Sequence, residues 1–277
     1  MKHAFLIITH GSYPIYELLL KAIDHPNCDI FVHVDKKVSK TEFNNFSNVP
    51  LDFSRLFILP CRHDVKWGGY SQIVTEMSLF EFAYNKGNYD YYHLLSGVDM
   101  LIKPINKVLK FFEDNNGYEF LGASNATQSF YNRVAFYHFI VPKGDFAKKI
   151  SALSVRVQKL LKVNRISIKE LYYGNNWGSF TNKFIMILLS NKAYIRKHFK
   201  YSFCADELYK QTIMKKYGHF HDKGSCRMID WKKGSPYVYT EDDYEEIVSS
   251  KYMFCRKFSV ENFSIVSKLY DFLVQDN

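Results

Sequence analysis

The sequence predicts an α/β fold, organised as a single domain around a mixed, mostly parallel central sheet. Over the first hundred residues, short β-rich runs alternate with stretches of helical periodicity, a pattern typical of parallel strands joined by crossover helices. The chain contains no internal repeat, low-complexity tract or Pro/Gly-rich linker. Its 277 residues suit one large domain or two small ones, and without a linker we expect one.

The first elements are predicted from hydrophobic periodicity. Ala4 to Thr9 is an apolar run that indicates a buried strand, and Tyr13 to Ile23 carries apolar residues at helical spacing. Strands at 30–34, 56–59 and 91–95 and a helix at 71–84 are expected to follow. His10, Asp35 and Asp99 each come just after a predicted strand. Because ligands of such sheets bind beyond the carboxyl ends of the strands, we expect these three side chains to line one crevice.

The second half of the chain is less regular, with helices predicted at 146–161, 183–189, 208–216 and 263–274. The first of these is amphipathic, with apolar residues at Phe146, Ile150, Leu153, Val157 and Leu160. Basic residues between Lys148 and Lys162 occupy its other side. Two interpretations stay open: an ordinary helix whose basic side is solvated, or a helix that lies on a membrane surface.

The composition narrows the possible ligands and compartments. The 37 lysines and arginines exceed the 28 acids, giving a net charge of +9, which favours an anionic ligand such as a nucleotide phosphate, a nucleic acid or a lipid surface. Five scattered cysteines without a Cys-x-x-Cys argue against a disulfide framework. The apolar start of the chain is far too short to span a membrane. No small-residue cleavage site follows it, so it indicates a first strand rather than a signal peptide. We therefore expect a cytoplasmic protein.

Several catalytic motifs are absent from the sequence. There is no G-x-G-x-x-G, no P-loop and no G-x-S-x-G, which weakens a dinucleotide-binding interpretation and excludes P-loop phosphoryl transfer and an α/β-hydrolase nucleophile. There is also no Asp-x-Asp, the pair that commonly holds a divalent metal against a nucleotide diphosphate. The nearest zinc-like group, His219-x-His221 with Cys226, lacks a fourth nearby ligand. We expect no metal site.

A set of short segments, in one order along the chain, is more specific. They are His33-Val34-Asp35-Lys36, Trp67-Gly68-Gly69-Tyr70-Ser71, Ser96-Gly97-Val98-Asp99, Asp206-Glu207, Asp230-Trp231 and Phe254-Cys255-Arg256-Lys257-Phe258. Together they resemble the core-2/I-branching and peptide O-xylosyltransferase family, family 14 of the glycosyltransferases, from about His3 to Phe258. The resemblance implies a GT-A-type, Rossmann-like fold, a nucleotide-sugar donor that is usually UDP-linked, inversion at the anomeric carbon and no requirement for a metal or other cofactor.

The resemblance also implies roles for individual residues. Glu207 matches the family's catalytic glutamate, which takes the proton from the attacking acceptor hydroxyl. Its neighbour Asp206 is expected to cap the helix that follows. Arg256 and Lys257 match the family's Phe-x-Arg-Lys-Phe block and would stabilise the departing diphosphate without a metal. Asp35 matches a position near the nucleoside.

The remaining candidates are less specific. His10 and Asp99 are assigned to the donor side of the same crevice, although His10 equally suits an ordinary strand-end histidine. Trp177 and Trp231 are candidate platforms for acceptor sugars because indole faces stack on pyranose rings, although each could instead belong to the core, and Asp230 is assigned to the acceptor with them. The additional arginine that some branching enzymes use against the diphosphate has no counterpart at 234–239.

These expectations define one function and two alternatives. The first is inverting, metal-independent transfer of a sugar, foremost GlcNAc, from a UDP-sugar to a hydroxyl of a glycan or lipid-linked glycan, in bacterial surface polysaccharide synthesis. The alternatives are a UDP-xylose-dependent xylosyltransferase and a non-enzymatic protein that binds an anionic polymer or carbohydrate. Nucleic acid is not expected as a partner, because the cations form no recognised module with exposed aromatic residues.

The sequence also predicts how the domain is organised and where in the cell the protein lies. Residues 1–125 would form the nucleotide-binding half and residues 126–277 the acceptor-binding and catalytic half of the one domain. The chain resembles a bacterial relative that lacks the anchor and stem of the animal enzymes, with peripheral contact at the inner face of the membrane through Lys148 to Lys162.

Overall fold

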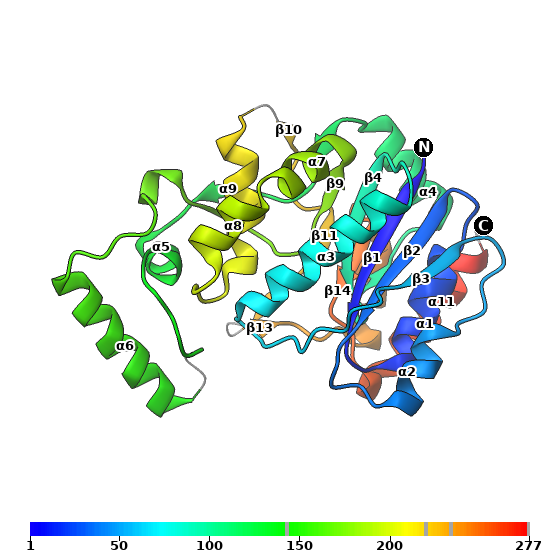
Figure 1. Ribbon diagram of the computed structural model, residues 1–277. Helices are drawn as coiled ribbons and strands as arrows, with labels where there is room; N and C mark the ends of the chain where they lie inside the picture. The colour runs from blue at the N-terminus through cyan, green and yellow to red at the C-terminus, as the bar shows by residue number, and fades with distance from the viewer. Residues whose placement is uncertain (142–143, 219–220, 233–234, 276–277) are drawn as a thin grey trace.

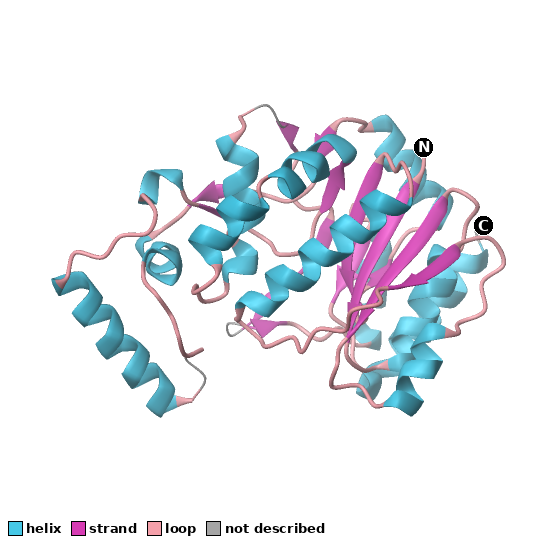
Figure 2. Ribbon diagram, in the orientation of Figure 1, coloured by secondary structure: helices cyan, strands magenta, loops and turns pink. Residues whose placement is uncertain are grey.

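A computed structural model describes residues 1–141, 144–218, 221–232 and 235–275. Its central sheet has the strand order β3-β2-β1-β4-β9 (Figures 1 and 2). These strands are β1 His3–Thr9, β2 Cys28–Val34, β3 Arg55–Ile58, β4 Tyr91–Ser96 and β9 Ser179–Thr181. The first four run parallel, and β9 runs antiparallel to β4. The predicted α/β fold with a mixed, mostly parallel sheet is confirmed.

Helices cover both faces of this sheet, which is why β1 and β2 are apolar along nearly their whole length. Alternate residues of a strand point to opposite faces. Phe5 and Ile7 therefore pack on one face with α1 (Tyr13–Ile23) and α11 (Phe263–Gln275). Ala4 and Leu6 pack on the other face with α3 (Tyr70–Lys86), the helix that lies across the sheet in Figure 1.

A second, smaller sheet joins the two halves of the chain. It has the order β11-β14-β5, with β5 at Met100–Leu101, β11 at Arg227–Ile229 and β14 at Phe254–Arg256. The antiparallel pairing of β14 with β5 places Arg256 beside the turn that precedes Met100. A residue near the C-terminus is thereby brought to the carboxyl end of β4.

Apart from α6, which has 16 residues, the remaining described elements have ten residues or fewer. The further helices are α2 Lys40–Ser47, α4 Ile105–Asp114, α5 Gln128–Ala135, α6 Asp145–Leu160, α7 Asn182–Ser190, α8 Lys192–Phe199, α9 Tyr209–Lys216 and α10 Tyr244–Ser249. The further strands are β6 Tyr118–Glu119, β7 Ser124–Asn125, β8 Tyr172–Tyr173, β10 His221–Asp222, β12 Trp231–Lys232 and β13 Ser235–Pro236. The described residues also form the 3₁₀ turns η1 Ile168–Glu170, η2 Ala205–Glu207, η3 Glu241–Asp243 and η4 Val260–Asn262.

The predicted helices and strands are present, with bounds that differ by a few residues at most. The helices α2, α4, α5, α8 and α10 and the strands after β4 were not predicted. Of these, α2 is marked by its N-terminus rather than by an apolar stripe. Ser39 accepts a hydrogen bond from the amide of Glu42, and the Glu42 carboxylate accepts one from the amide of Ser39. This capping box satisfies two amides that a short helix otherwise leaves free.

The helix α6 lies at the edge of the molecule, away from the central sheet (Figure 1). Its apolar stripe, which an ordinary packed helix would bury, is exposed at Phe146, Leu153 and Leu160. The interpretation of α6 as a helix packed through its apolar side is therefore wrong. Among the described residues, no helix is both long and apolar enough to cross a membrane.

Candidate active site

A pocket of about 650 Å³ opens beyond the carboxyl ends of β1, β2 and β4. The first half of the chain contributes residues from these strand ends and from the loop before α3, and the second half contributes three residues. The lining consists of Ile8, Thr9, His10, Asp35, Lys37, Asp64, Val65, Lys66, Trp67, Gln72, Ser96, Val141, Trp177 and Arg256. The volume is in the range of pockets that hold a nucleotide-sized ligand.

The structure brings four of the sequence-predicted residues to this pocket and places the others elsewhere. His10, Asp35, Trp177 and Arg256 line it. Asp99 does not line it but contacts Arg256 from behind.

The other four predicted residues have different surroundings. Glu207 lies on an adjoining wall, and Lys257 is half-buried outside the lining. Asp230 belongs to a separate pocket of about 250 Å³ with Arg227. Trp231 is exposed in the β12–β13 hairpin.

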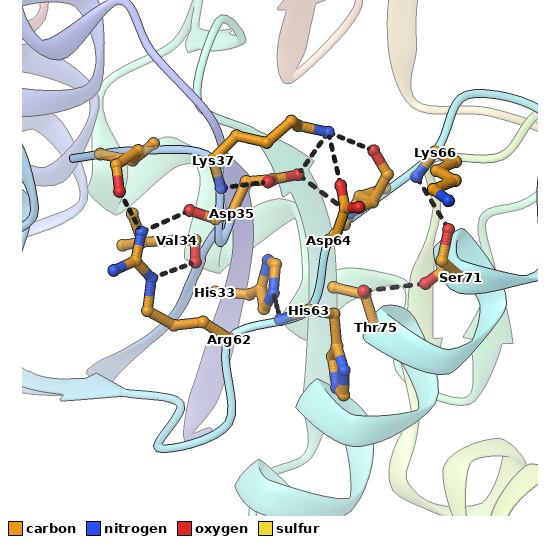
Figure 3. A network of polar contacts seen from close by, with 12 residues as sticks. His33, Val34, Asp35, Lys37, Arg62, His63, Asp64, Lys66, Ser71 and Thr75 are labelled. Atoms are coloured by element: carbon orange, nitrogen blue, oxygen red, sulfur yellow. Dashed lines mark hydrogen bonds and ion pairs between the residues drawn. The ribbon is translucent and has the colours of Figure 1, made fainter.

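The carboxylate of Asp35 fastens the loop before α3 to the end of β2 (Figure 3). One oxygen accepts a hydrogen bond from the amide of Lys37 at 2.9 Å, and the other accepts one from the amide of Val65 at 3.1 Å. The Lys37 ammonium lies 3.3 Å from both Asp35 and Asp64. Lys37 therefore compensates one of the two carboxylate charges at this end of the pocket.

The His-Val-Asp-Lys segment is held by two further contacts (Figure 3). Arg62 donates hydrogen bonds to the carbonyls of Val34 and Asp35. His33 accepts a hydrogen bond at Nε2 from the amide of His63, at 2.9 Å. Burial, with a smaller effect of His63, lowers the pKa of His33 to about 4, so the ring is neutral at pH 7 and able to accept. These contacts hold the strand end that carries Asp35, although His33 and Arg62 do not line the pocket themselves.

Arg256 is positioned by a carboxylate and an aromatic ring. Its Nη1 donates to Asp99 Oδ1 at 2.7 Å, and its guanidinium carbon lies 4.5 Å from the centre of the Trp177 ring. Asp99 is buried, and its second oxygen accepts from the amide of Ser96 at 2.8 Å. Burial raises the pKa of Asp99 while the Arg256 cation opposes that rise. The arrangement fixes a planar donor at the pocket wall, suited to phosphate oxygens.

Lys66 is a second cation of the lining. Within the part of the chain that the structure describes, no acid pairs with its ammonium, unlike that of Lys37. Its amide donates to the Ser71 hydroxyl at 2.8 Å, which ties Lys66 to the first turn of α3 (Figure 3). Sequence analysis did not single out Lys66, although it directly precedes the Trp-Gly-Gly segment. Lys66 and Arg256 are thus two pocket cations available to an anionic ligand.

The wall that carries Glu207 adjoins the pocket through the loop before α3. The Trp67 ring packs edge-on against Phe203 at 5.6 Å, and the carbonyl of Gly68 accepts a hydrogen bond from the amide of Cys204. Gly68 has a φ of +70°, and a Cβ there would lie 2.7 Å from the Phe203 ring. Only glycine permits this approach, which explains the first glycine of the segment. The turn η2 with Glu207 follows directly.

The Glu207 side chain is 30% exposed and forms an ion pair with Arg133 Nη1 at 2.9 Å. Arg133 comes from α5 and stacks over Phe130, with its guanidinium carbon 4.4 Å from the ring centre. The pair orients one carboxylate oxygen and leaves the other turned to a partly open surface. Nothing in the sequence singled out Arg133, because it lies 74 residues from its partner.

A buried polar cluster lies behind this wall. Lys210 is fully buried and donates to Glu76 and to the side-chain oxygen of Asn176, the residue before Trp177. Tyr209 also donates to Glu76, at 2.7 Å. Gln72 of the pocket lining donates to Asp206 at 3.4 Å. The cluster thereby links α3 and α9 beneath Trp177 and Glu207.

The predicted helix cap at Asp206 is wrong. Its carboxylate makes no cap hydrogen bond to α9 and is instead buried towards the cluster. Burial, and then the negative charges of Glu76 and Glu207, raise the pKa of Asp206 to about 7, while Lys210 opposes the rise. Desolvation outweighs the nearby cation because the carboxylate is almost fully enclosed.

This shift predicts a pH-dependent stability for Asp206→Asn. Because the pKa of Asp206 is higher in the folded chain than in the unfolded chain, its contribution to stability is full below about pH 4 and is lost as the pH rises through about 7. The asparagine does not titrate. The free energy of unfolding of the variant, relative to the parent, is therefore expected to rise by about 2–4 kcal/mol between pH 4 and pH 8. Urea unfolding at both pH values measures this, and a pH-independent difference would contradict it.

The chain matches a family of known proteins. Residues 3–253 match the family model described as Core-2/I-Branching enzyme. The chain belongs to this family of glycosyltransferases. It is 21% identical over 301 residues to Xylosyltransferase oxt of Drosophila pseudoobscura pseudoobscura, across 98% of this chain. The chain spans about a third of the length of that relative, 33%.

A solved structure is also similar to this chain. The crystal structure of S. aureus TarS 1–349 matches with a TM-score of 0.41 and 13% sequence identity, covering 100% of this chain and 66% of TarS 1–349.

The predicted division of the domain into two halves and the predicted absence of a metal site both stay predictions. The pocket draws residues from both 1–125 and 126–277, and the division into nucleotide and acceptor halves stays a prediction. Of the zinc-like group, Cys226 is buried and His221 is exposed on β10, while His219 lies outside the described residues.

Proposed function

We propose that this family member transfers a sugar, foremost GlcNAc, from a UDP-sugar to a hydroxyl of a glycan acceptor, with inversion and without a metal. The observation that carries the proposal is Arg256, a pocket-lining guanidinium fixed by Asp99 and Trp177 at the carboxyl ends of the central strands. A departing diphosphate concentrates negative charge. Arg256 and Lys66 supply positive charge at the same pocket.

The donor site follows from this placement. The diphosphate would bind Arg256 and Lys66, and the nucleoside would lie towards the end of β2, where Asp35 and His10 line the pocket. Asp35 would act there chiefly by holding the loop, because both of its oxygens already accept backbone hydrogen bonds. The role of Lys257 stays a proposal from the family resemblance.

The chemical step needs a base and a leaving group. Glu207 would take the proton of the acceptor hydroxyl while that oxygen bonds to the anomeric carbon. The bond from the anomeric carbon to the diphosphate oxygen breaks, and its electron pair leaves with UDP. Arg133 holds one Glu207 oxygen, so the hydroxyl would bind the other. Of the two predicted acceptor platforms, Trp177 is the candidate, because it lines the pocket and stacks on Arg256 whereas Trp231 does not line it.

A UDP-xylose donor is the second candidate, favoured by the similarity to Xylosyltransferase oxt. UDP is the leaving group of both UDP-GlcNAc and UDP-xylose, so the proposed roles of Arg256 and Glu207 are the same for either donor. We propose that the reaction uses cytoplasmic donor and contributes to the synthesis of a bacterial surface polysaccharide.

A thermal-shift screen in excess EDTA tests the donor class. A ligand present at about one hundred times its Kd stabilises the folded chain by about 2.7 kcal/mol, which raises Tm by roughly 5–8 °C for a chain of this size. We expect this shift with UDP and one UDP-sugar, and little shift with CDP or GDP at the same concentration. Shifts of equal size with all nucleotides, or a shift that requires Mn²⁺, would contradict the proposal.

A further inference from the structure

The helix α6 packs against the protein through its polar side. Gln158 is buried, and its amide accepts from the backbone N–H of Tyr137 at 2.8 Å and donates to the carbonyl of Tyr137 at 3.0 Å. Ser151 contacts the His138 ring at 3.3 Å. The side of the helix that holds these residues is therefore fixed to the segment before it.

The apolar stripe of the same helix consequently faces outward. Phe146, Leu153 and Leu160 are 78%, 62% and 83% exposed. Further exposed apolar side chains extend this surface, at Phe139, Ile140, Ile150, Val157 and Leu161. Phe139, Ile150, Leu153 and Val157 line one hollow, and an exposed apolar patch marks an interaction site more often than a free surface. We call these eight residues the α6 surface.

The charge around the α6 surface is strongly positive. Residues 136–169 contain eight lysines and arginines and one acid, Asp145, so most of the net charge of +9 is concentrated here. Lys149 lies three residues after Phe146 and four before Leu153, which places it beside the stripe. Arg156 has the same relation to Leu153 and Leu160. Both cations are exposed.

We propose that the α6 surface lies on an anionic lipid bilayer. The apolar stripe would enter the boundary between headgroups and acyl chains, while Lys149 and Arg156 contact anionic headgroups at its edge. A second copy of the chain fits less well, because it would bring the same cations together. A soluble polyanion would compensate the charge but leave the phenylalanine and leucine side chains in water.

The α6 surface is adjacent in sequence to one residue of the pocket lining. Val141, directly after Phe139 and Ile140 of the α6 surface, lines the candidate active site. Binding through the α6 surface would therefore bring the pocket close to the bilayer, where a lipid-linked glycan would be presented. That consequence rests on the proposed function, whereas lipid binding itself does not.

Flotation of the full chain with vesicles tests the proposal. The vesicles are phosphatidylcholine alone or phosphatidylcholine with 30% phosphatidylglycerol, at low and at high salt. We expect binding to be at least about tenfold stronger to the anionic vesicles, and to weaken in high salt. Leu153→Ser with Leu160→Ser should abolish it, and Lys149→Glu with Arg156→Glu should lower binding by at least about tenfold.

Matched controls make the equivalent apolar-to-serine and cation-to-glutamate changes at exposed positions elsewhere. Met186→Ser with Val274→Ser removes exposed apolar side chains outside the α6 surface, and Lys40→Glu with Lys251→Glu reverses exposed cations outside it. Both controls should bind like the parent. All substituted positions are exposed, and unchanged thermal unfolding verifies that each variant is folded.

Three results would overturn the proposal. They are equal binding to neutral and anionic vesicles, equal losses in the α6 variants and the controls, or a dimer in sedimentation that Leu153→Ser with Leu160→Ser dissociates. UDP binding in the α6 variants should equal that of the parent. This separates a failure of membrane binding from a failure of the proposed sugar transfer.

Discussion

Glu207→Gln is expected to lower kcat by roughly 10²–10⁴-fold, the usual contribution of a general base, while UDP affinity stays within about twofold. The amide keeps the shape of the side chain and can still accept from Arg133, but it cannot take a proton. Glu207 does not line the pocket, so the contacts available to a nucleotide should be unaffected. Steady-state kinetics with titrated UDP binding measure both quantities.

Glu170→Gln is the matched control for this prediction. Glu170 is an exposed acid in another 3₁₀ turn, η1, and has no place at the pocket. Its kcat should equal that of the parent. If Glu207→Gln turned over at the parental rate, the assignment of the base would be wrong.

Arg256→Ala should weaken UDP binding by about 10–100-fold, since a hydrogen bond to a charged group contributes about 1.5–3 kcal/mol. The same change leaves Asp99 buried without its cation, so the free energy of unfolding should also fall. Arg256→Ala with Asp99→Asn removes that stranded charge. The double variant is expected to recover stability while its UDP affinity stays low, which calorimetric titration and urea unfolding distinguish.

Two further variants sharpen the assignment of Arg256. Arg256→Lys retains the charge but loses the planar fork, so its affinity should lie between those of the parent and Arg256→Ala. Lys40→Ala, at an exposed position outside the pocket, should leave affinity unchanged. UDP affinity that is equal in Arg256→Ala and Lys40→Ala would contradict a diphosphate site at Arg256.

Much of the fold could be predicted because its signals are local. β1 contains a continuous apolar run, β2 is mostly apolar, and α1 has an apolar stripe. The strand ends at His10 and Asp35 followed from these elements, and both residues line the pocket. The helix α2 was missed because a capping box at Ser39, rather than apolar periodicity, marks it.

The rest of the candidate site depends on contacts between distant segments, which no local pattern encodes. Asp99 meets Arg256 across 157 residues through the β5–β14 pairing. Arg133 meets Glu207 through the packing of α5 near η2. Asp206 was expected to cap a helix because it precedes one, but its carboxylate is turned into the buried cluster with Glu76.

The orientation of α6 could not be predicted from the sequence either. Periodicity in the sequence establishes that one side of α6 is apolar, but not which side faces the protein. Gln158, an unremarkable polar residue in the sequence, decides the orientation through its two hydrogen bonds to Tyr137. The concentration of cations at 136–169 is visible in the sequence. Only the orientation of α6 shows that these cations border an exposed apolar surface.

The most direct test of the central claim is a transfer assay with a panel of UDP-sugars in excess EDTA, with the anomeric configuration of the product determined by NMR. We expect one UDP-sugar to release UDP in step with a glycoside of inverted configuration, and Glu207→Gln to form none above background. A product of retained configuration, or activity only after Mn²⁺ is restored, would contradict an inverting, metal-independent glycosyltransferase built on Glu207 and Arg256.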